Sequence, residues 1–78
     1  MVHDDRIPDE VLDRFRISGK PVRVIRDADE NNDVIGTVVA WNDDFILIRK
    51  KNRKVVKLSR RYRICAADEP RISLEELL

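Results

Sequence analysis

The spacing of apolar residues along the chain changes from helical to alternating near Pro21. In residues 7–18 the apolar positions fall on one stripe of a helix: Ile7, Val11, Leu12 and Phe15. Pro8 is typical of the first position of a helix, and Gly19 permits the left-handed backbone that often follows the last one. Pro21 then disfavours helical backbone in the residue before it. The pattern therefore predicts a short N-terminal helix over residues 7–18.

Residues 21–67 have the pattern of a small antiparallel sheet. Short apolar runs are separated there by polar turns: "PVRVIRD", "VIGTVVAW", "FILIRK", "KVVKL" and "RRYRICAA". The second and third runs are apolar on both faces, as expected if one face fills a core and the other lies under the helix or a neighbouring subunit. Gly36, inside the second run, indicates a sharp bend. We expect a mainly β fold, a small five-stranded and strongly bent antiparallel barrel.

The end of the chain predicts one further element. In "SLEELL" the pair Ser73 and Glu76 has the spacing of a capping box, so residues 73–78 are a possible short helix. No repeat, low-complexity tract or internal boundary interrupts the chain. We therefore treat residues 1–78 as a single domain.

Positive charge is concentrated in one stretch, Arg49–Arg63, which we call the basic segment. Nine of its fifteen residues are Lys or Arg and none is Asp or Glu, although the net charge of the chain is only +1. Apolar residues are interleaved with these cations, so the segment is predicted to lie on the fourth and fifth strands and their flanking turns. A stiff strand holds cations at fixed spacing, which suits a nucleic-acid backbone. Alternatively, the cations protect edge strands or pair with acidic residues of "DADENND" or of the helix on a neighbouring subunit.

Composition disfavours several classes of protein. With 78 residues, 40% of them charged, the chain has little apolar surface to spare, which favours assembly with copies of itself. The single cysteine, Cys65, excludes an internal disulfide and favours a reducing, cytoplasmic location. No apolar stretch suits a signal peptide or a membrane span. With His3 as the only histidine and two glycines in all, nothing indicates an enzyme, a metal, a cofactor or a small-molecule substrate.

The order of these features resembles the Sm-like proteins, and within them the bacterial Hfq branch of RNA chaperones. The similar positions, in chain order, are Pro21-Val22, Gly36, Asn42 to Asp44, Phe45 with Ile46-Leu47-Ile48, Arg60-Arg61-Tyr62-Arg63-Ile64, and Pro70. The resemblance spans residues 7–70. It implies a ring, commonly of six or seven subunits, that closes by strand pairing between neighbours and binds RNA around its pore and rim.

On this basis we expect the chain to bind single-stranded RNA as a homo-oligomer. The residues predicted to contact RNA are Phe45, Lys57, Arg60, Arg61, Tyr62 and Arg63. Cations of the preceding turn would add diffuse attraction: Lys50, Lys51, Arg53 and Lys54. Basic side chains would bind phosphates, whereas Tyr62 and Phe45 would stack on bases.

Other interpretations of the same residues remain open at this level. Phe45 and Tyr62 could simply be packed in the core, and Trp41 could pack or contact a neighbouring subunit. The separation of acidic and basic residues is also typical of an SH3-like protein-interaction or assembly module that binds no nucleic acid. A DNA-bound architectural protein is a third possibility.

Overall fold

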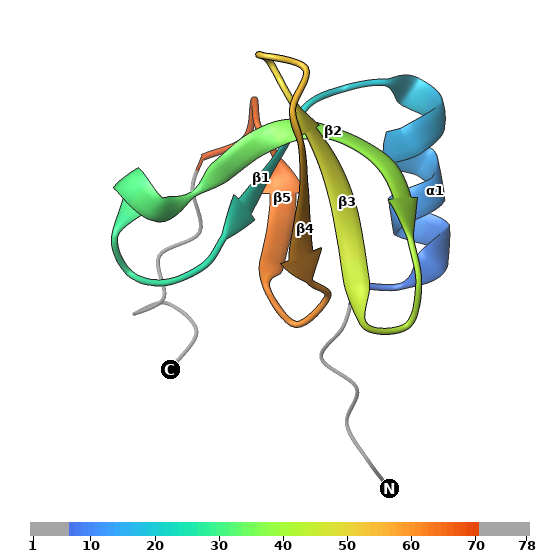
Figure 1. The fold of residues 1–78 in the computed structure, drawn as a ribbon, viewed down its shortest axis with the longest axis horizontal. Helices are drawn as coiled ribbons and strands as arrows, with labels where there is room; N and C mark the ends of the chain where they lie inside the picture. The colour runs from blue at the N-terminus through green and yellow to red at the C-terminus, as the bar shows by residue number, and fades with distance from the viewer. Residues whose placement is uncertain (1–6, 71–78) are drawn as a thin grey trace, which may run out of the picture.

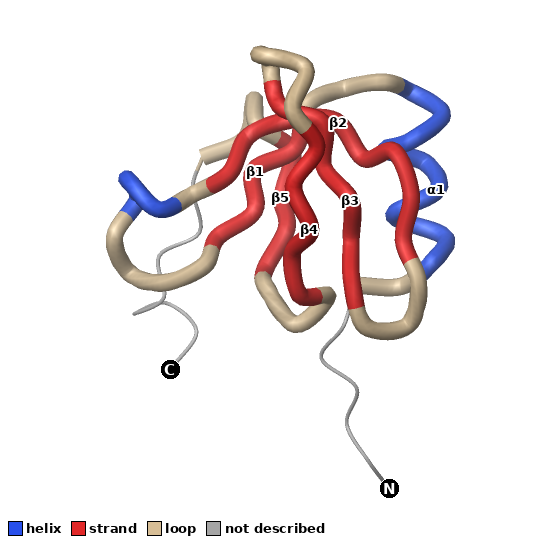
Figure 2. The backbone as a smooth tube through the Cα atoms, in the orientation of Figure 1, coloured by secondary structure: helices blue, strands red, loops and turns tan. Residues whose placement is uncertain are grey.

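The computed structural model describes residues 7–70, and the helix predicted over residues 73–78 lies outside them. The elements follow in the order α1 (Asp9–Ser18), β1 (Val22–Ile25), the 3-10 helix η1 (Glu30–Asn32), β2 (Val34–Trp41), β3 (Phe45–Lys50), β4 (Val55–Ser59) and β5 (Arg63–Ala66). Figure 1 shows the helix beside a curved sheet, and Figure 2 shows the long turns that join the strands. The N-terminal helix and the five predicted strands are confirmed.

Helix α1 begins at Asp9 because Pro8, predicted inside the helix, is its cap. Pro8 has an extended backbone, and its carbonyl oxygen accepts hydrogen bonds from the N–H groups of Val11 and Leu12 at 3.1 and 3.2 Å. At the other end Gly19, with φ of 68°, donates its N–H to the Phe15 carbonyl oxygen at 3.1 Å. Leu12 is fully buried and Ile7 and Phe15 pack against the core, so the predicted apolar stripe faces the sheet.

The strands form one antiparallel sheet in the order β4-β3-β2-β1-β5. Strand β1 lies between β2 and β5, with Val22 opposite Gly36 on one side and Ala66 on the other. Strand β3 lies between β2 and β4. Because β4 and β5 are the two edges and do not pair with each other, the sheet is open, and the expected closure into a barrel is not seen (Figure 1).

The sheet bends along β2, where the backbone comes close to β3 (Figure 1). A Cβ atom added at Gly36 would lie 2.4 Å from the Arg49 carbonyl oxygen and 2.7 Å from Ile48 Cγ2. Farther along, the register of β2 with β3 shifts between Val38 and Ala40, which is the mark of a β-bulge. Gly36 is therefore required by the close approach of two backbones, in agreement with the prediction of a bend.

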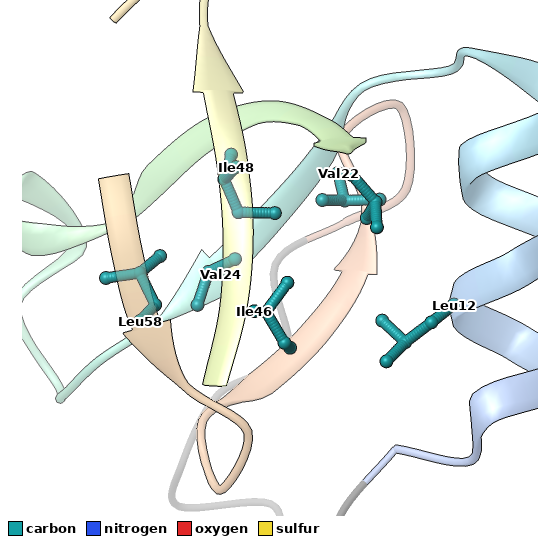
Figure 3. Close-up of a cluster of buried hydrophobic side chains, with 7 residues drawn as sticks. Leu12, Val22, Val24, Ile46, Ile48 and Leu58 are labelled. Carbon is teal, nitrogen blue, oxygen red and sulfur yellow. The ribbon is translucent and has the colours of Figure 1, made fainter. Parts of the chain in front are cut away.

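The core fills the space between the inner face of the sheet and α1 (Figure 3). Its buried members are Leu12, Val22, Val24, Val38, Ile46, Ile48 and Leu58. Since successive side chains of a strand point to opposite faces, Phe45, Leu47 and Lys57 lie on the outer face of the sheet. The arrangement of the core thus decides which side chains of β3 and β4 face solvent.

One local prediction is corrected by the structure, and another is made more precise. The fifth strand begins at Arg63 instead of Arg60, because residues 60–62 form the turn between β4 and β5; in this turn the Tyr62 N–H donates to the Ser59 carbonyl oxygen at 3.3 Å. The segment "DADENND" joins the antiparallel strands β1 and β2, as predicted, and contains η1. The side chain of Asp29 caps η1 by accepting a hydrogen bond from the Asn31 N–H at 2.9 Å.

Candidate nucleic-acid interface

The fold divides the basic segment into two groups at opposite ends of β4. The β3–β4 group lies at the turn between these strands and consists of Arg49, Lys50, Lys51, Arg53 and Lys54. The β4–β5 group consists of Arg60, Arg61 and Arg63, together with Lys57, which lies in the middle of β4 and reaches the ring of Phe45. In Figure 1 the β3–β4 turn lies at the top of the molecule and the β4–β5 turn at the bottom. At about 3.3 Å per residue, β4 separates the two turns by roughly 15 Å.

Phe45 and Lys57 form the aromatic part of the β4–β5 end. Phe45 is 38% exposed, so it is a surface residue at the start of β3 and not a core residue. The Nζ atom of Lys57 lies 4.0 Å from the centroid of the Phe45 ring. At an exposed site such a cation–π contact contributes about 0.5–1 kcal/mol. The contact holds an ammonium group and an aromatic face next to each other on the outer face of the sheet.

Arg61 and Arg63 are exposed on either side of Tyr62, which is half-buried. The Tyr62 ring packs against the core, and the Cζ atom of Arg26 lies 6.0 Å from the ring centroid. The Arg61 N–H donates to the Ser59 hydroxyl oxygen at 3.2 Å and so helps to fix the turn. Two guanidinium groups are thus presented to solvent, while the tyrosine offers only part of its ring.

Arg60 differs from these neighbours because it is buried, with 3% of its surface exposed. Its Nη1 donates to the Asn42 carbonyl oxygen at 2.8 Å, and its Nη2 donates to the Ile7 carbonyl oxygen at 2.6 Å. Nη2 also lies 2.8 Å from Oδ1 of Asp9, whose side chain is 69% exposed. Arg60 therefore joins the β4–β5 turn, the β2–β3 turn and the start of α1. Its guanidinium is bound to the protein itself and is not presented to a phosphate.

The β3–β4 turn is closed by backbone hydrogen bonds. The Arg53 N–H donates to the Lys50 carbonyl oxygen, and the Lys50 N–H donates to the Lys54 carbonyl oxygen, both at 2.8 Å. Arg53 has φ of 70°, the left-handed region that glycine and asparagine usually occupy in such hairpins. The turn forms one side of a groove of about 880 Å³, lined by Pro21, Ile35, Gly36, Thr37, Arg49, Lys50, Lys51 and Arg53.

Within residues 7–70, the cations of the basic segment other than Arg60 have no carboxylate partner. The ion pairs in this part of the chain join Arg16 to Asp13 at 2.8 Å, Arg23 to Asp33 at 3.1 Å and Arg60 to Asp9. Eight cations of the segment therefore form no ion pair with a carboxylate of the described chain. A polyanion or an acidic surface of another molecule can neutralise them.

Two cations near these surfaces were not predicted from the sequence. Arg49 lies on the outer face of β3, opposite Val55, and lines the groove. The alternation of "FILIR" places it on the same face as Phe45, so this signal was available. Arg26 follows β1, and its proximity to Tyr62 depends on the pairing of β1 with β5, for which the sequence carries no local signal.

No family model, no curated protein and no solved structure matches the chain. Among the described residues, every helix is too short or too polar to cross a bilayer. The same part of the chain contains no cluster of three or more His, Cys, Asp or Glu side chains arranged to hold a metal ion. The functional assignment therefore depends on the geometry of the two cation groups.

Proposed function

We propose that this chain is an Sm-like RNA-binding protein and that its β4–β5 end binds single-stranded RNA. The observation that carries the proposal is the exposed Phe45 ring with Lys57 Nζ 4.0 Å from its centroid, at the end of β4 from which the turn with the exposed Arg61 leads to Arg63. Single-stranded RNA is commonly bound by an aromatic platform beside cations. A helix followed by five antiparallel strands, with a glycine in the bent second strand, agrees with the fold that the resemblance implies.

In this mechanism each side chain has a distinct role. Arg61 and Arg63 bind phosphates and release counterions from the RNA. A base stacks on the Phe45 ring, and Lys57, displaced from that ring, pairs with the adjacent phosphate. Tyr62 adds the exposed part of its ring. Arg60 holds the β4–β5 turn in place without touching the RNA.

The open edges of the sheet support assembly into a ring. Within residues 7–70, strands β4 and β5 each have one side of their backbone without a strand partner. Pairing of β4 of one copy with β5 of the next satisfies both edges, and a rotation that closes on itself gives a ring. Six or seven subunits are the numbers that the resemblance implies. A ring repeats the β4–β5 end around its axis, so one RNA strand can contact several copies at once.

The test measures binding of a labelled single-stranded RNA of about ten nucleotides by fluorescence anisotropy over a series of salt concentrations. We expect the affinity to fall steeply as salt rises. Replacing Arg61 and Arg63 together with alanine should weaken binding and reduce the slope of log affinity against log salt by about 1.4, or about 0.7 for each phosphate that is no longer neutralised. The control is R14A/K20A, which removes the same charge from exposed positions outside the basic segment.

Three results would contradict the proposal, and each points elsewhere. Absence of binding at low salt, together with oligomers that dissociate in salt by light scattering, would favour an SH3-like assembly module. An equal loss of affinity in R61A/R63A and R14A/K20A would mean that only net charge matters. Tighter binding of duplex DNA than of the RNA would favour an architectural DNA-binding role.

A further inference from the structure

We infer that the groove beside the β3–β4 turn is a second binding site, which takes a nucleoside phosphate. The groove is lined by residues of the β3–β4 turn. This turn lies at the opposite end of β4 from the β4–β5 turn (Figure 1), so the inference goes beyond the proposed function and does not require it. The phosphate would be bound by Arg49, Lys51 and Arg53. The base and sugar would lie against Pro21 and Ile35.

The backbone of Arg53 is the first reason for this assignment. Its φ of 70° places a residue with a Cβ atom in a conformation that glycine or asparagine adopts more easily. Among the described residues, no hydrogen bond or ion pair of the Arg53 side chain compensates for this conformation. A strained residue in the lining of a groove, with no side-chain hydrogen bond or ion pair within the described chain, is typical of a functional position.

The chemistry of the groove walls is the second reason. The described part of the lining has four cations and no acidic residue. Two of these cations are arginines, whose planar guanidinium matches the oxygens of a phosphate with paired hydrogen bonds. The rest of the lining includes Pro21 and Ile35, and Ile35 is 44% exposed although it belongs to β2. The groove of about 880 Å³ has the size of a small-molecule site. An anionic ligand with a flat, partly apolar body fits this lining.

The same chemistry can come from a free nucleotide or from one nucleotide unit of an RNA strand, and the experiment separates them. Backbone amide signals of the ¹⁵N-labelled protein are followed by NMR during titration with adenosine 5′-monophosphate, inorganic phosphate, adenosine, or a short single-stranded RNA. We expect the monophosphate to shift the amides of Thr37, Arg49 and Lys51 in a saturable manner, and phosphate or adenosine alone to bind at least about tenfold more weakly.

Arg53→Gly is the diagnostic variant because glycine is compatible with the observed backbone. It should fold with an unchanged or higher Tm, whereas its affinity for the monophosphate should fall at least about tenfold. Lys51→Ala, which leaves the strained residue in place, should weaken binding in the same direction. Arg14→Ala, at an exposed position outside the basic segment, is the control of equal charge, and it should leave the titration of the groove unchanged.

The outcomes separate this inference from the proposed function. Groove amides that respond only to the RNA, and respond less in R53G, support a nucleotide unit of RNA as the ligand. Equal binding of phosphate and of the monophosphate would overturn the assignment of a nucleoside. Groove amides that respond to none of the ligands, or an R53G variant that binds as well as the natural chain, would overturn the site altogether. RNA binding that depends on Arg61 and Arg63 would stand in either case.

Discussion

Replacing Arg60 with methionine tests whether one cation of the basic segment serves the fold alone. Methionine replaces the unbranched aliphatic stem of arginine with an apolar side chain that has no charge and no hydrogen-bond donor. The change deletes the donors to the carbonyl oxygens of Asn42 and Ile7, together with the ion pair to Asp9. It leaves the neighbouring Arg61 in place, so the positive charge presented to solvent is almost unaltered.

The magnitude follows from these contacts. A hydrogen bond from a charged group contributes about 1.5–3 kcal/mol, so the two carbonyl contacts together give about 3–6 kcal/mol. The pair with the exposed Asp9 adds less than about 1 kcal/mol. The buried Nε of Arg60 has no hydrogen-bond partner among the described residues, and its removal returns part of this stabilisation. We expect the free energy of unfolding to fall by about 3–4 kcal/mol, from a total of roughly 4–12 kcal/mol for a chain of this length.

Urea unfolding, followed by the fluorescence of Trp41, measures the change, and Arg61→Met is the matched control. The exposed Arg61 should contribute less than about 0.5 kcal/mol. In RNA binding at low temperature R61M should have the larger effect of the two variants. It should reduce the slope of log affinity against log salt by about 0.7, while R60M leaves this slope unchanged. If R60M does not fold, R60K keeps one donor and should lose about 2 kcal/mol. An R60M variant as stable as R61M would refute the structural role of Arg60.

Two further substitutions test the bend and the β2–β3 turn. Gly36→Ala should lower the free energy of unfolding by about 3 kcal/mol, because the added Cβ would meet the Arg49 carbonyl oxygen and Ile48. Gly19→Ala should lower it by only about 1 kcal/mol, because the site has open space and the one cost is its left-handed backbone. Thermal unfolding that ranks the two variants in the opposite order would contradict the close approach of β2 and β3. Asn42→Ala should cost about 1 kcal/mol in the same assay, since the side-chain oxygen accepts hydrogen bonds from the N–H groups of Asp44 and Phe45 at 2.8 Å. Asn31→Ala is the control, and an equal effect of the two asparagines would show that these hydrogen bonds do not hold the turn.

Much of the fold can be predicted from the sequence because the local signals agree with one another. The runs "VIGTVVAW" and "FILIRK" coincide with β2 and β3, since polar residues stop each run at a turn. Gly36 is identified as the bend because no other residue type tolerates that approach of backbones. For β2 and β3 the chemistry of neighbouring residues is sufficient to predict the strand, and contacts between distant segments change only the residues at which each strand begins and ends.

The candidate site is less predictable, because it depends on contacts between distant segments. Arg60 and Arg61 are chemically identical and adjacent, yet one is buried and the other exposed. The difference arises from carbonyl groups 18 and 53 residues away, at Asn42 and Ile7. Phe45 is a similar case. It opens an apolar strand, but its place in the alternation puts it on the outer face, where Lys57 covers its ring.

The division of the basic segment also follows from the geometry of a hairpin. Residues that are continuous in the sequence become separated by the length of a strand when a turn precedes that strand and another follows it. Here five cations of the basic segment lie around the β3–β4 turn. In the β4–β5 group Arg60 is bound to carbonyl groups of the protein, so three accessible cations remain, Lys57, Arg61 and Arg63. The charge that a ligand meets is therefore set by the positions of two turns and one buried arginine. Each surface therefore presents fewer cations than the nine of the segment, and the two surfaces can bind different phosphate groups independently.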